Sequence, residues 1–301
     1  MKRFKKLLVP LELNDSDSST IAWAGKVSQM AGSEEVLFVH ATDVAELPET
    51  ATQKYPWLME PLDDVLEKRM QELVSKFWKG REGIDQQFKV LKKRSPVFGV
   101  LNEVFEQESD LVVVGRSEEA MDLSLRLARK SDCSVMVVPE GASVKLRSIV
   151  TATDFSDLGK VAIDIAEAFA LKEGLKSIFS LNITGTGKMS HRMTIPQEEL
   201  EKMTVQFADE KHETYLSTID NKGIELKRCT KVHGHVASGV SAFVRENDID
   251  MIIAGCRGKD TITSMFLGSN AEEILKSANV PVIAAKVKGR GRSFLAELFN
   301  V

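Results

Sequence analysis

The second half of this chain repeats the pattern of its first half, and this repeat constrains the fold more than any other feature. Residues 110–115 and residues 250–255 each consist of an acidic residue, four apolar residues and a glycine, 140 positions apart. Near the start of each half, Glu12 aligns with Asp154 at a spacing of 142 positions. A repeat of this length has the size of a domain, and 301 residues are more than one hydrophobic core usually serves. We therefore predict two tandem domains of the same fold.

The boundaries of the two domains follow from the repeat and from one turn-rich segment. Residues 139–143 combine proline, glycine and serine, which is typical of a link between domains. We predict a first domain over residues 1–140 and a second over residues 146–288. The remaining segment, residues 289–301, is basic and then amphipathic. We expect it to dock on this protein or on a second copy, with contact to a membrane surface as the alternative.

Strand and helix patterns alternate along both halves. Short apolar runs that end in glycine, such as residues 251–255, are typical of strands buried on both faces of a parallel sheet. Residues 197–221 have the pattern of a long helix, and Gly223 is its expected C-cap. This alternation predicts an α/β fold with a parallel sheet covered on both faces. Such sheets bind ligands at the carboxyl ends of their strands.

Composition and charge argue against several classes of protein. Hydrophobic residues make up 43% and charged residues 28% of the chain, as in soluble globular domains. The formal net charge of −4 provides no basic field for nucleic acid, and the apolar runs are too short to cross a membrane. The start lacks the apolar core of a signal peptide, and the three widely spaced cysteines form no disulfide framework. We expect a cytoplasmic protein that does not bind nucleic acid, and membrane contact stays only as the alternative given for the tail.

One loop in the second half has the glycine spacing of a phosphate-binding loop. Gly255 is followed after two residues by Gly258, and nine further residues lead to Gly268 and Ser269 at the start of a predicted helix. Glycines let the backbone approach an anion closely, and unpaired amides at a helix N-terminus favour negative charge. Ser269 and Asn270 either add polar contacts to the anion or cap the helix. The loop therefore predicts a phosphate site between a strand end and a helix start.

With these motifs the chain resembles a tandem universal stress protein. The Gly-x2-Gly-x9-Gly-Ser spacing is the nucleotide-phosphate signature of that family, and the resemblance covers residues 4–139 and 146–287. It implies two five-stranded, Rossmann-like domains of the adenine nucleotide α-hydrolase type. The second domain would bind ATP, with Mg²⁺ left open as a companion ion. The resemblance also implies a role in the stress response through an unidentified protein partner.

The resemblance assigns the site residues of the second domain. The five residues of the loop named above would hold the phosphates. Ala152, Thr153 and Asp154 would lie at the adenosine end, where the carboxylate suits a ribose hydroxyl; the alternative is that Asp154 caps the following helix. Val236 stands where the family has the proline of a Gly-x-Pro segment, so the adenine contact of that loop departs from the family. Arg257 would either neutralise phosphate charge or remain in solvent.

The residues of this site favour binding over catalysis. No paired carboxylates, no Gly-x4-Gly-Lys-Ser loop and no nucleophile elbow stand out in the sequence. We therefore predict no catalytic residue, no metal site made by the protein and at most weak ATP hydrolysis. Two alternatives stay open at this point: an enzyme that activates a substrate by adenylation, and a scaffold without a ligand.

The first half lacks the phosphate motif. Its loop after Gly115 is seven residues shorter than the matching loop of the second half, and it carries Glu118 and Glu119. Glu12 replaces the shorter Asp154. Because carboxylates repel an anion, we expect the first domain not to bind ATP, with a different ligand as the alternative. We expect it to pair with the second domain, as subunits of the resembling family do; a homodimer through edge strands stays open.

Overall fold

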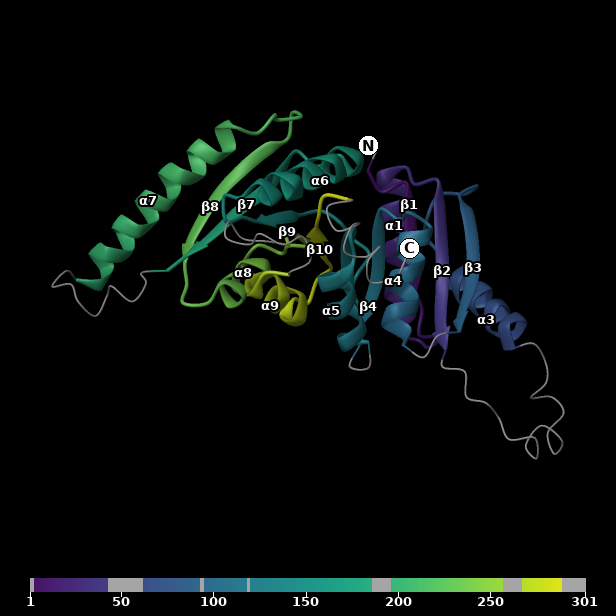
Figure 1. The fold of residues 1–301 in the computed structure, drawn as a ribbon. Helices are drawn as coiled ribbons and strands as arrows, with labels where there is room; N and C mark the ends of the chain where they lie inside the picture. The colour runs from purple at the N-terminus through teal and green to yellow at the C-terminus, as the bar shows by residue number, and fades with distance from the viewer. Residues whose placement is uncertain are drawn as a thin grey trace. The chain divides into compact units, whose positions relative to one another are not determined.

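The structure is a computed structural model that describes residues 3–42, 62–92, 95–117, 120–185, 196–256 and 267–288. The chain divides into two compact units. The first comprises Met1–Val144 together with Lys288–Val301, and the second comprises Lys145–Val287. Among the described residues, helices and strands of the first unit run from purple to teal in Figure 1, and those of the second run from teal to yellow.

The first unit alternates strands and helices around one parallel sheet. Its elements are β1 (Lys6–Pro10), α1 (Asp17–Ala31), β2 (Glu35–Thr42), α3 (Leu62–Phe77), β3 (Asp85–Lys92), α4 (Pro96–Glu106), β4 (Leu111–Arg116), α5 (Met121–Lys130) and β5 (Ser134–Pro139). The strands pair in the order β3-β2-β1-β4-β5, all parallel. Helix α1 packs beside α3 and helix α4 beside α5, as right-handed crossovers on the two faces of the sheet require.

The second unit repeats this arrangement. Its elements are β6 (Ile149–Ala152), α6 (Asp157–Glu173), β7 (Ser177–Thr184), α7 (Gln197–Ser217), β8 (Glu225–Val232), α8 (Val236–Glu246), β9 (Met251–Gly255), α9 (Ser269–Ser277) and β10 (Val282–Ala285). The strands pair in parallel in the order β8-β7-β6-β9-β10. Helices α6 and α7 cover one face, and α8 and α9 cover the other (Figure 1). The predicted α/β class with two parallel-sheet domains is confirmed.

Both faces of the central strands are buried, which is why they are apolar without alternation. Met251, Ile252 and Ile253 of β9 are at most 1% exposed. Helix α6 covers them with residues spaced three and four apart, among them Ile165 and Phe169, which are 0% exposed. The core of the second unit therefore has two layers, one between α6 and the central strands and one on the other face, where Phe243 of α8 and Leu275 of α9 are buried.

Helix α7 ends earlier than its sequence pattern indicates. We predicted a helix over residues 197–221 capped by Gly223, but the helix ends at Ser217, where Thr218 is the C-cap. The side chain of Asn221 accepts hydrogen bonds from the amides of Gly223 and Ile224, at 2.8 Å and 3.1 Å. This side chain builds a separate turn into β8, and Gly223, with a φ of 87°, belongs to that turn.

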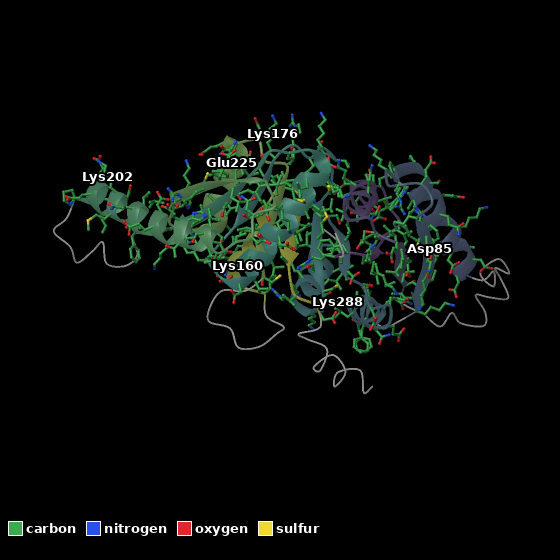
Figure 2. The ribbon with its side chains drawn as sticks, turned by 90° about the horizontal axis from the view of Figure 1, so that it is seen from above. Asp85, Lys160, Lys176, Lys202, Glu225 and Lys288 are labelled. Atoms are coloured by element: carbon green, nitrogen blue, oxygen red, sulfur yellow. The ribbon has the colours of Figure 1, made fainter. Side chains whose placement is uncertain are left out.

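The amino and carboxyl ends of the strands lie at opposite ends of the second sheet. Figure 2 shows Lys176, before β7, and Glu225, at the start of β8, at the amino ends of their strands. Lys160 in the first turn of α6 lies toward the opposite end, because α6 begins where β6 has ended. The carboxyl ends of the strands, and with them the site, lie on the Lys160 side. Within the described ranges, no helix is long and apolar enough to span a membrane.

Candidate functional site

A pocket of about 530 Å³ opens at the carboxyl ends of β6, β7 and β9 in the second unit. Its volume lies within the usual range for pockets that bind small molecules. It is lined by Ala152, Thr153, Asp154, Leu181, Asn182, Ile183, Val236, Val240, Ala254, Gly255, Cys256, Leu267, Gly268, Ser269, Asn270, Ala271 and Ile274.

The structure brings most of the predicted site residues together in this pocket. Four elements supply them, namely the residues at and after the end of β6, the end of β9, the start of α8 and the start of α9. These residues are Ala152, Thr153, Asp154, Val236, Gly255, Gly268, Ser269 and Asn270. Arg257 and Gly258 lie outside the described residues.

The start of α9 lies at the pocket, beside the end of β9. Gly268 is the N-cap residue, and no side-chain hydrogen bond caps the described part of this helix. Ser269 and Asn270 therefore do not cap it, contrary to one of the two alternatives. The amide of Gly268 donates to the carbonyl of Cys256 at 2.7 Å, which fixes the helix start against the end of β9. The amides of Ser269 and Asn270 thus lie at the pocket without a capping side chain from the described residues, and the helix dipole favours negative charge there.

Asp154 lies at the rim of the pocket and does not cap α6. Its Oδ1 accepts a hydrogen bond from the amide of Ser156 at 3.1 Å. The N-cap of α6 is Ser156, whose hydroxyl accepts from the amide of Gly159 at 3.3 Å. Because Ser156 takes the capping role, the exposed Asp154 carboxylate remains placed for a ligand.

Sequence reasoning missed Asn182 and the apolar wall of the pocket. Asn182 Nδ2 donates to the carbonyl of Thr153 at 2.8 Å and so holds the strand end that carries Asp154. The wall comprises Leu181, Ile183, Val240, Leu267 and Ile274. These residues form no motif. Only the rule that ligands bind at the ends of neighbouring parallel strands would have indicated Asn182.

The first unit holds the equivalent strand end with a different side chain. His40 Nδ1 lies 2.8 Å from the carbonyl of Leu11, so the imidazole donates to it as Asn182 does in the second unit. The backbone also matches, since the amides of Leu11 and Thr153 donate to β2 and β7 at 2.8 Å and 2.9 Å. The two units therefore share a scaffold at this position and differ in the residues around it.

The described part of the loop after β4 in the first unit is held by hydrogen bonds within the protein. Strand β4 continues through Arg116, which pairs with Pro139, and the Arg116 carbonyl accepts from the amide of Glu140 at 3.2 Å. The hydroxyl of Ser117 accepts from the amide of Ala120 at 3.0 Å, just before α5 begins. The amide of the N-cap residue Ala120 is thus bound within the protein, as the amide of Gly268 is at α9, and no side-chain hydrogen bond caps the described part of α5 either. Glu118 and Glu119 lie outside the described residues.

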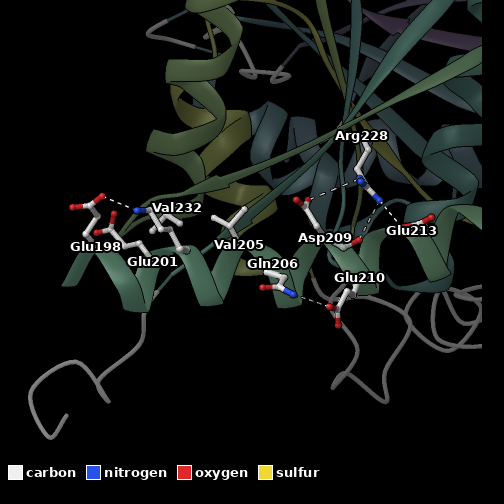
Figure 3. A pocket seen from close by; sticks show the side chains of 10 residues that line it. Glu198, Glu201, Val205, Gln206, Asp209, Glu210, Glu213, Arg228 and Val232 are labelled. Atoms are coloured by element: carbon white, nitrogen blue, oxygen red, sulfur yellow. Dashed lines mark hydrogen bonds and ion pairs between the residues drawn. The ribbon is translucent and has the colours of Figure 1, made fainter. Parts of the chain in front are cut away.

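A second hollow in the second unit does not suit an anion. This groove, of about 630 Å³, lies between α7 and β8 and carries five carboxylates and two cations among its lining residues (Figure 3). Both cations already face carboxylates: Arg228 lies 3.0 Å from Glu213, and Lys202 lies 2.8 Å from Glu198. The remaining negative charge would repel a phosphate.

A buried histidine makes the second unit sensitive to acid. His212 of α7 is 0% exposed, and its Nε2 lies 2.8 Å from the hydroxyl of Ser180. Burial, with Arg228 nearby, lowers the pKa of His212 to about 4. A histidine with a folded-state pKa below its unfolded value favours the folded state only while neutral. The contribution of His212 to stability is therefore complete above about pH 6.5 and is lost between about pH 6.5 and 4, by up to about 1.4 kcal/mol per pH unit.

We expect His212→Gln to remove this part of the pH dependence. Hydrogen exchange of peptides from α7 and β7 would report the free energy of opening of the second unit. All three tryptophans lie in the first half, so tryptophan fluorescence measures the first unit as an internal control. An equal slope between pH 6.5 and 4 in the wild type and the variant would contradict the role of His212.

The fold and the pocket together define a duplicated Rossmann-like α/β protein with a ligand-sized pocket at the strand ends of its second unit. The chain belongs to the universal stress protein family, which matches it twice, over residues 3–139 and residues 145–286. The predicted tandem organisation is thereby confirmed.

The relatives found by sequence match about half of this chain, and a solved structure matches nearly all of its fold. Universal stress protein MJ0577 of Methanocaldococcus jannaschii is 25% identical over 161 residues, which cover 48% of this chain and 98% of that protein. Universal stress protein G of Shigella flexneri is 25% identical over 131 residues, 43% of this chain and 90% of that protein. The crystal structure of a universal stress protein from Archaeoglobus fulgidus DSM 4304 covers 95% of this chain and 98% of its own, with a TM-score of 0.60 and 16% identity. This last similarity shows a shared fold.

Proposed function

We propose that the second domain binds ATP and that the protein acts in the cytoplasm, in the stress response, through a protein partner that depends on nucleotide occupancy. The domain boundaries that we propose are residues 1–140 and 146–288, with a tail at 289–301. The observation that carries the proposal is the uncapped start of α9, which faces a pocket whose other walls hold Asp154 and an apolar surface. Pairing between the two domains and between two copies remains a prediction.

The chemistry of the pocket matches the parts of an adenine nucleotide. The amides of Ser269 and Asn270 would receive phosphate oxygens, since a helix N-terminus favours anions. The apolar wall would cover the base, and Asp154 would accept a hydrogen bond from a ribose hydroxyl. When ATP is bound, its phosphates would place negative charge at the start of α9, and its adenine ring would lie against the apolar wall.

The same pocket supports binding rather than catalysis. Among the described residues that line it, Asp154 is the single charged side chain. These residues therefore form no pair of a general acid and a general base. The described ranges contain no cluster of three His, Cys, Asp or Glu residues that could hold a metal ion. We therefore expect any Mg²⁺ to be held by the phosphates of ATP and at most weak hydrolysis.

Isothermal titration of the full chain with ATP tests the proposal. We expect one ATP per chain, because the sequence before α5 in the first unit carries Glu118 and Glu119, whose carboxylates would repel phosphate. Titration with and without Mg²⁺ would show whether the ion contributes to affinity. An absence of binding at millimolar ATP, or release of pyrophosphate with a co-substrate, would contradict the proposal in favour of a scaffold or an adenylating enzyme.

A further inference from the structure

The loop that carries Asp154 has a conformation that an ordinary residue adopts only at a cost. Phe155, directly after Asp154, has a φ of 64°, in the left-handed region that bulky side chains rarely occupy. Such a backbone persists only where its surroundings hold it in place. Its amide donates to the hydroxyl of Thr153 at 3.0 Å, which is one restraint within the loop.

The other restraints come from α7, which is distant in sequence. The ring of Phe155 packs against the rings of His212 and Tyr215, with centroid distances of 5.3 Å and 5.5 Å. The hydroxyl of Tyr215 donates to the carbonyl of Ser156 at 3.2 Å and also forms a hydrogen bond with the Thr153 side chain. Two residues of α7 therefore hold the loop on both sides of Asp154, although neither lines the pocket.

The backbone of α6 leaves room for this contact. A Cβ atom on Gly159 would lie 2.6 Å from the Tyr215 hydroxyl and 2.9 Å from the Thr153 hydroxyl. Tyr215 is 6% exposed, and burial raises its pKa to about 12, so its hydroxyl remains a donor at neutral pH. The glycine and the tyrosine together form a close contact between α7, α6 and the loop.

The first unit restrains the equivalent loop through a side chain of α1, without help from a helix distant in sequence. Leu13, the equivalent of Phe155, has a φ of 63°. Here the carboxylate of Asp17, in the first turn of α1, accepts hydrogen bonds from the amides of Glu12, Leu13 and Asn14, at 3.1 Å, 2.7 Å and 3.3 Å. In the second unit Gly159 occupies the position of Asp17, so the local carboxylate is absent and α7 takes over the restraint.

We propose that Tyr215 and His212 are positioning residues of the nucleotide site, which act through Phe155 to hold Asp154 toward the ligand. This inference rests on the proposed function. It predicts that α7 contributes to the affinity for ATP through the contacts of Asp154 with the adenosine. The phosphate end, at α9, lies on the opposite face of the sheet from α7 and is independent of it.

The test compares two ligands and four proteins. Isothermal titration would measure the affinity of the full chain for ATP and for inorganic tripolyphosphate, which lacks the adenosine. The variants are Tyr215→Phe, which removes one hydroxyl, Phe155→Leu, which introduces the residue of the first unit, and the control Lys211→Gln on the exposed part of α7. We expect Tyr215→Phe and Phe155→Leu to weaken ATP binding about 3- to 10-fold, as loss of a hydrogen bond or a ring contact does. Tripolyphosphate affinity should stay within about twofold of the wild type.

A double-mutant cycle with Asp154→Ala separates positioning from general destabilisation. If Tyr215 acts through Asp154, Tyr215→Phe should have little further effect on ATP affinity once Asp154 is removed. Equal weakening of ATP and tripolyphosphate, or additive effects in the cycle, would overturn the inference. So would wild-type affinity in both variants while the proposed function stands, whereas a wild type that binds no ATP would overturn the proposed function itself.

Discussion

Replacement of Gly268 by glutamate is expected to raise the Kd for ATP at least about 100-fold. The new carboxylate would lie at the N-cap of α9, where the phosphates are proposed to bind. A unit charge about 5 Å from a phosphate charge is repelled by about 3 kcal/mol at an effective dielectric constant of 20, which exceeds the roughly 2.7 kcal/mol that a 100-fold loss requires. Isothermal titration of the full chain would measure the change.

Two controls show whether charge at this position is responsible. Gly268→Gln adds the same bulk without the charge, and we expect it to weaken ATP binding about 10-fold or less. Ser117→Glu adds a carboxylate at the corresponding loop of the first unit, before α5, and should leave ATP affinity unchanged. Wild-type affinity in Gly268→Glu, or a loss of binding in Ser117→Glu alone, would show that the phosphates bind elsewhere.

The second large effect is expected from Gly255→Ala. A Cβ at this position would lie 2.9 Å from both the carbonyl carbon and the Cβ of Leu158, and 3.1 Å from the amide of Gly159. Two of these atoms belong to the backbone of the first turn of α6, which cannot move without shifting the helix. We expect the second unit to lose about 2–3 kcal/mol of stability, as overpacked cores do. ATP affinity should also fall, because the shift displaces the loop that carries Asp154.

The first unit provides a matched control for this substitution. A Cβ on Gly115 would meet the hydroxyl of Thr20 at 2.8 Å, and the next atom, the Thr20 Cβ, lies 3.9 Å away. Because a side-chain oxygen can move more cheaply than backbone, Gly115→Ala should cost less than about 1.5 kcal/mol. Hydrogen exchange would measure the second unit and tryptophan fluorescence the first. Equal losses in the two variants would contradict the argument from backbone contact.

The sequence was sufficient to predict the fold because its signals are local and repeated. The apolar run 251–255 and the strand Val282–Ala285 appear where their composition indicates. The glycine spacing before α9 is a short-range pattern of the same kind, and the phosphate binding that it indicates stays a prediction. The helix end of α7 was predicted wrongly because Asn221 bonds to its own neighbours, which competes with helix formation after Ser217.

The supports of the site could not be predicted from such patterns. The bond from Asn182 to Thr153 joins residues 29 apart, and the bond from Tyr215 to Ser156 joins residues 59 apart. No motif links such pairs, because their proximity results from strand order and from the packing of α7. The exposed Asp154 illustrates the same limit: its spacing to α6 fitted a helix cap, and only the structure shows that Ser156 fills that role.

A crystal structure of the full chain grown with ATP tests the central claim most directly. The account predicts triphosphate density at the amides of Ser269 and Asn270, with the adenosine directed toward Asp154 in the second unit. Nucleotide density beside Glu12 in the first unit, or an empty pocket beside Asp154 at saturating ATP, would contradict it.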